Sequence, residues 1–262
     1  MGVNRWICIG ILILLPLTGC AVVKTESPAR IALLAPFEGR YREIGYSALY
    51  PARLAFMDVT HVALLAVDDG GSVQTAIDRA RALTRDPLVK GVIVLGHNAT
   101  DPTVQAVFDD LPVLVVGYWH HPPQQANVFM FTSANIPSML GEWREITEDP
   151  MPLGGDAYAL QSFAQLHPNL DGVQVVSSGT PPDTDFIARV QASDQFAAAP
   201  GLLGTTVYDA ASLLIDLIDN PAMPRTHVLQ AINATGVFVD GYWQNAPVHI
   251  YEYINGVLRE SN

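Results

Sequence analysis

The sequence contains few cysteines and few basic residues. Its 262 residues include 2 cysteines, and 14 Lys and Arg side chains stand against 26 Asp and Glu, giving a formal net charge of −12 at pH 7. A negative charge of this size disfavours binding to nucleic acid and electrostatic attachment to anionic lipid. Cys8 and Cys20 both lie near the start, so the rest of the chain can form no internal disulfide and must be stabilised by a hydrophobic core.

The apolar run at residues 6–17 is too short for a comfortable membrane span, which needs about 20 residues. It follows Arg5 and has the proportions of a signal peptide. The run ends in the sequence LTGC, at Cys20, which resembles the bacterial lipobox. This resemblance implies that residues 1–19 are removed, that Cys20 is lipidated, and that residues 20–29 form a tether. The alternative is an ordinary signal peptide in which Cys20 is incidental.

The first half of the chain alternates between strand and helix patterns. Apolar runs at residues 31–36, 61–67, 91–96 and 112–117 are typical of parallel strands covered on both faces. Between them, apolar residues recur with helical spacing, and the helices are expected at residues 46–57, 73–84 and 103–111. Ser72 and Asp101 are expected to cap the second and third helices. The pattern predicts an α/β fold with a doubly wound parallel sheet, whose ligands bind beyond the carboxyl ends of the strands.

Residues 31–56, IALLAPFEGRYREIGYSALYPARLAF, resemble the opening of type I periplasmic solute-binding proteins of the branched-chain amino acid group. Pro36, Gly39, Tyr41 and Gly45 stand where that family has a proline, a glycine, an aromatic residue and a second glycine. The later segments VKGVIVLGHNATDPTVQA, LPVLVVGY and LLGTTVYDAASLLIDLI are similar to the family as well. The resemblance implies a periplasmic-binding-protein-like I fold, and the short sequence after TSANIPSMLGEWREITEDP implies a reduced second lobe.

The resemblance also implies a division of the chain and a function. Residues 30–126 and 197–236 would form the first lobe, and residues 127–196 and 237–262 the reduced second lobe. The protein would be lipid-anchored on the extracytoplasmic face of the cell membrane and bind an amino acid or similar small solute for an ABC importer. Its partners would be the permease subunits, and it would need no cofactor. The alternative is a degenerate relative that binds no solute and acts as a surface interaction or scaffold lipoprotein.

The family's contacts to an amino acid's charged groups match two places in this chain. The loop of Asn98, Ala99 and Thr100 matches the donors for the solute's carboxylate, although Asn98 and Thr100 can equally be turn and capping residues. Asp156, after a glycine-rich turn, matches the acid that binds the ammonium group. A role as cap of the helix that follows it is the alternative.

Aromatic residues occupy the other matching positions. Tyr41, Tyr118 and Trp119 would contact a bulky or flat solute, or fill the pocket with their own side chains. No G-x-S-x-G motif is present, and His97, His120 and His121 lack the partners of a metal site, so neither catalysis nor a metal is expected. The residues expected to line the solute are Tyr41, Asn98, Ala99, Thr100, Tyr118, Trp119 and Asp156.

Overall fold

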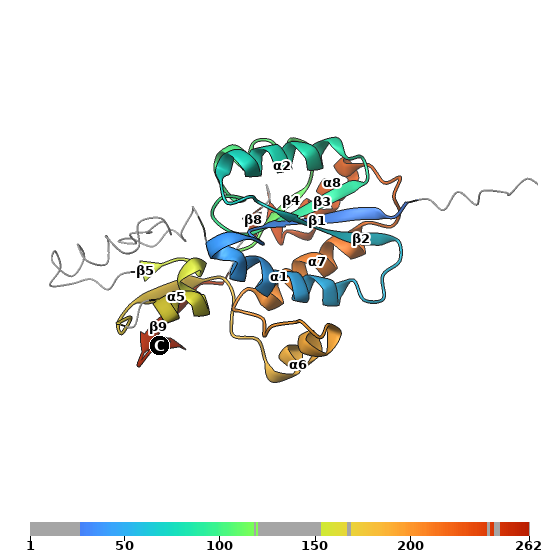
Figure 1. Cartoon of the computed structure of the whole chain (residues 1–262). Helices are drawn as coiled ribbons and strands as arrows, with labels where there is room; N and C mark the ends of the chain where they lie inside the picture. Colours follow the sequence, from blue (N-terminus) through green and yellow to red (C-terminus); the bar gives the residue numbers. More distant parts are fainter. Residues whose placement is uncertain are drawn as a thin grey trace, which may run out of the picture.

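The computed structural model describes residues 27–117, 119, 153–166, 169–239, 242–243 and 247–261 (Figure 1). Cys20, the expected signal peptide and Tyr118 lie outside these residues, so the predictions made for them stay predictions. Within the described ranges, no helix has the length and apolar character needed to cross a membrane.

The first sheet has the strand order β2-β1-β3-β4-β8-β7. Its first four strands are β1 (Ala29–Ala35), β2 (Val62–Asp68), β3 (Val89–Val94) and β4 (Val113–Val115). They pair in parallel, which confirms the four strands predicted from the apolar runs. Two short strands extend the sheet: β8 (Tyr242–Trp243) runs parallel to β4, and β7 (Phe238–Val239) pairs antiparallel with β8.

Helices cover both faces of this sheet, and the side chains of β1 show why. Ile31 and Leu33 point into one core and Ala32 and Leu34 into the other, because successive residues of a strand face opposite sides. Figure 1 shows α2 on one side of the sheet and α1 and α7 on the other. The first core is completed by α1 (Arg42–Ala55), α7 (Gly204–Leu217) and α8 (Arg225–Thr235), and the second by α2 (Val73–Arg85) and α3 (Pro102–Gln105).

The predicted helix starts after β2 and β3 are confirmed. The Ser72 hydroxyl accepts the Thr75 N–H at 3.2 Å, and the Asp101 carboxylate accepts the Thr103 N–H at 2.8 Å. The third helix is shorter than residues 103–111, because the N–H of Phe108 bonds three residues back and Asp109 adopts a left-handed φ of 50°. The first helix, α1, begins earlier than residue 46.

The start of α1 lies directly against the end of β1. A Cβ on Gly45 would overlap the carbonyl oxygen of Pro36, so only glycine allows this approach. The approach places the first turn of α1, including Glu43, at the edge where the parallel strands end.

A second, smaller sheet lies beyond that edge (Figure 1). Its order is β10-β9-β6-β5, and only β5 and β6 are parallel. Its core is aromatic: Tyr158, Phe163, Tyr251 and Tyr253 are all buried. The elements are β5 (Leu153–Gly154), the 3₁₀ helix η2 (Asp156–Ala159), α5 (Gln161–Leu166), β6 (Gln174–Ser177), β9 (His249–Ile254) and β10 (Val257–Glu260).

The two sheets correct the expected division of the chain into residues 30–126 with 197–236 and 127–196 with 237–262. Strands β7 and β8 belong to the first sheet, where Phe238 is buried in the core. Helix α6 (Thr184–Ser193) also packs on the first lobe, through Phe186 and Val190 against Tyr50 of α1. Phe238 is buried in the first core, and Phe186 and Val190 form a separate small cluster with Tyr50, so neither segment belongs to the second lobe.

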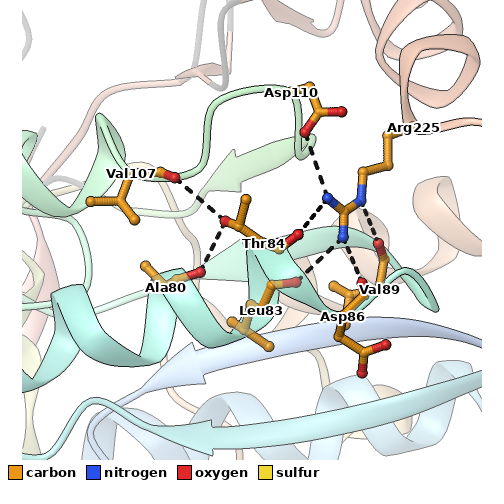
Figure 2. Close-up of polar contacts among 8 residues, drawn as sticks. All are labelled: Ala80, Leu83, Thr84, Asp86, Val89, Val107, Asp110 and Arg225. Carbon is orange, nitrogen blue, oxygen red and sulfur yellow. Dashed lines mark hydrogen bonds and ion pairs between the residues drawn. The ribbon is translucent and has the colours of Figure 1, made fainter.

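Arg225, the first residue of α8, joins a late part of the chain to the first lobe (Figure 2). Its guanidinium donates to the carbonyl oxygens of Val89 at 2.9 Å, Thr84 at 2.8 Å and Asp86 at 2.6 Å. The Asp110 carboxylate lies 3.5 Å away. The carbonyls of Thr84 and Asp86 lie at the end of α2, and that of Val89 lies at the start of β3. One guanidinium therefore binds carbonyl oxygens that have no partner within the helix.

Candidate functional site

A cavity of about 330 Å³ lies between the two sheets, beyond the carboxyl ends of the parallel strands. Both lobes contribute to its wall, with α1, Leu95 after β3 and Trp119 after β4 on one side and η2 and the start of α5 on the other. A connecting segment, residues 198–203, completes the described wall. The lining residues are Glu43, Ile44, Tyr46, Ser47, Leu95, Trp119, Asp156, Ala159, Leu160, Gln161 and residues 198–203.

Glu43 connects the lobes across this cavity. Its carboxylate accepts the N–H of Gln161 at 2.6 Å and the N–H of Ser162 at 2.8 Å. These are the first two residues of α5, whose N–H groups have no partner within the helix. Glu43 could not be identified from the sequence, because its partners lie more than a hundred residues further along the chain and no local motif marks it.

Asp156 lies on the opposite side, with 4% of its surface exposed. The Ser177 hydroxyl, at the end of β6, donates to its carboxylate, and the Gly179 N–H donates to the Ser177 hydroxyl at 3.0 Å. Asp156 is the first residue of η2, and Gly155 occupies the capping position before it. The carboxylate is therefore held by β6, and the capping alternative does not describe its position.

Trp119 brings the first lobe next to Asp156. The indole is 8% exposed, and its Nε1–H donates to the Val116 carbonyl oxygen at 2.6 Å. Gly117 allows Trp119 and Asp156 to lie this close to the backbone. Its φ is +91°, and a Cβ there would lie 2.9 Å from both Asp156 Oδ2 and Trp119 Nε1. Trp119 and Asp156 are therefore neighbours in the cavity wall.

The loop of Asn98, Ala99 and Thr100 does not line this cavity. The Thr100 hydroxyl donates to the Gly96 carbonyl at 2.7 Å, and the Asn98 amide donates to the Asp69 carboxylate at 3.4 Å. Ala99 is fully buried in the core beneath α2 and α3. The geometry gives this loop a turn role, so the expected solute contact there is not part of the site described here.

Tyr41 also lies outside the cavity lining. Its ring packs against the first core, and the Arg40 guanidinium lies 5.9 Å from the ring centroid. Six of the seven residues expected to line a solute are described, and two of these six, Trp119 and Asp156, line the cavity.

Asp69 follows β2 at the edge where the parallel strands end. Asp69 is buried, which raises its pKa, while it accepts the Gly71 N–H at 2.8 Å. Among the described residues, no group of three His, Cys, Asp or Glu side chains is placed to hold a metal ion. Through its bonds to the Gly71 N–H and the Asn98 amide, the Asp69 carboxylate holds the turn after β2.

Comparison with known proteins gives structural relatives only. No protein-family model matches the sequence, and no curated protein matches it significantly. The leucine-binding protein LivK of Thermotoga maritima superposes with a TM-score of 0.67 at 12% identity, over 89% of this chain and 98% of that one. The fold is that of the type I periplasmic binding proteins.

Two further structures of that fold carry a ligand. The branched-chain amino acid transporter substrate-binding protein LivJ of Streptococcus pneumoniae, in complex with isoleucine, has a TM-score of 0.63 at 11% identity, over 88% of this chain and 98% of that one. An ABC transporter substrate-binding protein of Desulfitobacterium hafniense, in complex with Leu, has a TM-score of 0.59 at 11% identity, over 90% and 100%. The predicted fold class, a type I periplasmic binding fold with a reduced second lobe, is confirmed.

Proposed function

We propose that the protein is a non-enzymatic solute-binding protein whose ligand occupies the cavity between the two sheets. The observation that carries this proposal is the composition of the cavity wall, which takes side chains from both lobes at the carboxyl ends of the parallel strands. Ligands of open α/β sheets bind in this position. The cavity, about 330 Å³, has the size of small-molecule sites.

The similar structures support a role in import. Two of them are substrate-binding proteins of transporters that hold isoleucine or leucine, and the third is a leucine-binding protein. By this similarity, the protein would deliver a small solute of amino acid size to the permease subunits of an ABC importer. The sequence identity to these proteins is 11–12%, so their ligands do not identify the solute of this protein. The residues that line the cavity have to be used instead.

The lipobox-like sequence supports the proposed location on the extracytoplasmic face of the cell membrane. Lipidation at Cys20 would hold the protein there, since its net charge of −12 gives no attraction to anionic lipid. Cys20→Ser should release the protein from membranes or leave it unprocessed, measured by detergent-phase partitioning and by the mass of the product. Normal processing and membrane retention of Cys20→Ser would contradict the anchor.

A cavity-filling variant tests the binding site. A Cβ on Gly201 would make ordinary contacts with Ser47, its closest atom 3.8 Å away, so Gly201→Leu extends a side chain across the cavity without overlap at the backbone. A thermal-shift screen of the chain from Ala21, using amino acids, amines and other small solutes, should identify ligands of the parent. Tight binding stabilises by about 2.7 kcal/mol at a hundredfold excess over Kd.

Gly201→Leu should lose that shift, whereas Ala234→Leu should keep it, because Ala234 is exposed on α8 and the variant places the same leucine side chain away from the cavity. Equal shifts in both variants would show that the solute binds elsewhere. No shift with any solute would favour the scaffold function.

A further inference from the structure

Two kinds of contact join the lobes beside the cavity. The first is close packing: Leu160 of the second lobe packs against the first core as well as against the aromatic core of its own lobe. The second is polar: the Glu43 carboxylate of α1 accepts the N–H groups of Gln161 and Ser162, at 2.6 and 2.8 Å. Residues 160–162 therefore form one continuous patch of contact between the lobes.

The Glu43 contact depends on charge more than on burial. Each carboxylate oxygen accepts one N–H, and bonds to an ionised acceptor are roughly twice as strong as bonds between neutral groups. Gln161 is exposed and Ser162 is half-buried, so water can replace the carboxylate when the lobes separate. The contact therefore favours the joined lobes, and breaking it leaves no buried N–H group without a partner.

A short segment connects the lobes and allows such a separation. Between the end of β6 and the start of α6, residues 178–183 cross from the second lobe to the first. Gly179 is fixed in this crossing, because a Cβ there would overlap the Leu202 carbonyl oxygen. The residues after it, 180–183, are mostly exposed and belong to no helix or strand. A segment of this kind can absorb the backbone rotation of a hinge between two packed bodies.

We propose that Glu43 is a latch, which holds the lobes together over the cavity and lets the second lobe move away when its two bonds break. Glu43 acts as a positioning residue, because it fixes α5 against α1 and needs no contact with a solute to do so. A solute that touches both lobes binds tightly only while they are joined, so its affinity scales with the fraction of molecules in which the latch is closed. This last consequence rests on the proposed function, whereas the latch itself does not.

The reaction rate of a buried thiol measures how often the lobes separate. The chain from Ala21 contains no cysteine, so Leu95→Cys introduces a single thiol. Leu95 lines the cavity from the first lobe with 1% of its surface exposed, so a reagent reaches this position only when the lobes move apart. The reagent is 4,4′-dithiodipyridine, which is uncharged, so removing a carboxylate does not change its attraction to the protein.

Glu43→Gln is the test variant, because its amide keeps one acceptor oxygen and turns an NH₂ group toward the other N–H donor. The thiol at position 95 should then react roughly tenfold faster or more, which is the factor for losing one charged hydrogen bond. Asp68→Asn is the matched control. The Asp68 carboxylate also accepts two neighbouring N–H groups, those of Phe37 and Glu38 at 2.6 and 3.0 Å, but these lie within the first lobe. This control should leave the rate at position 95 unchanged.

A second thiol separates opening of the lobes from a loss of overall stability. Leu34→Cys places the thiol in the core that α2 and α3 cover, where Leu34 is fully buried. Opening of the lobes leaves this core intact, so the thiol reacts only when the first lobe unfolds. Glu43→Gln should therefore leave the rate at position 34 unchanged while it raises the rate at position 95.

Three results would overturn the latch. They are an unchanged rate at position 95 in Glu43→Gln, equal acceleration at positions 95 and 34, and equal acceleration at position 95 by Glu43→Gln and Asp68→Asn. Each of these leaves the proposed function as it was, because the thiol reactions contain no solute. Solute binding is tested separately by the thermal shifts of the parent and Gly201→Leu, and its failure would leave the latch in place.

Discussion

The two sheets of this protein are stabilised in different ways. The first is parallel except for its short edge strand β7, and aliphatic side chains such as Leu33 and Leu34 fill a core on each face. The second is smaller and mixed, and its core is built from aromatic rings, with the Tyr253 hydroxyl donating to the Tyr158 carbonyl at 2.7 Å. A lobe with less area to bury relies on large rings, and the hydroxyls of two of them, Tyr251 and Tyr253, donate to backbone carbonyl oxygens. The first lobe is therefore expected to be the stable scaffold and the second the weaker part.

Matched leucines should give the largest effect and test this difference. Leu33 is fully buried in the first core, and Leu170 is buried in the second. Leu33→Ala should lower the free energy of unfolding by about 3–5 kcal/mol and Leu170→Ala by about 2–3 kcal/mol, because a rigid core cannot close around the space left behind. Urea unfolding followed by circular dichroism measures both. The reverse order would show that the second lobe is the better packed.

Arg225 should give the next effect, within the first lobe. Arg225→Gln removes charged donors from the carbonyls of Thr84, Asp86 and Val89, and should lower the free energy of unfolding by about 2 kcal/mol. Arg81→Gln is the control, because Arg81 pairs on the surface with Asp78 and its loss should cost less than about 1 kcal/mol. Equal losses in the same urea experiment would show that the contacts in Figure 2 add nothing to stability.

The tyrosines of the second core should give a smaller, pH-dependent effect. Burial, followed by the negative charge of Glu43, raises the pKa of Tyr253 to about 12. The unfolded chain loses its phenolic protons near pH 10, so stability is present below that pH and is lost between about pH 10 and 12.

Tyr253→Phe should cost about 1 kcal/mol at pH 7 through its lost hydrogen bond, and should flatten the fall in melting temperature between pH 9.5 and 11. Tyr46→Phe, whose ring is exposed, should leave that fall unchanged. If the melting temperature of Tyr253→Phe falls as steeply between pH 9.5 and 11 as that of the parent, Tyr253 does not cause the alkaline loss of stability.

The sequence predicted best the features that depend on neighbouring residues. Continuous apolar runs marked the parallel strands, and the caps at Ser72 and Asp101 marked two helix starts. These signals are local, because a strand buried on both faces and an N-cap can each be recognised from a few neighbouring residues.

The features that depend on distant contacts could not be predicted in the same way. Glu43 accepts hydrogen bonds from the second lobe. A glutamate in the first turn of a helix is too common to indicate such a contact. Strands β7 and β8 have two residues each, too few to show a period, and only the edge of the first sheet determines where they pair. For the loop from Asn98 to Thr100, the turn and solute alternatives used the same residue types, and only the hydrogen bond to Gly96 distinguishes them.

The position of a bound solute tests the central claim most directly. A crystal structure of the chain from Ala21, with the solute that gives the largest thermal shift, should show that solute in the cavity that joins the lobes, in contact with Trp119 and Asp156. Glu43 should keep its bonds to Gln161 and Ser162 in that complex. A solute bound at the edge formed by Asp69 and Asn98, with the cavity empty, would contradict the account.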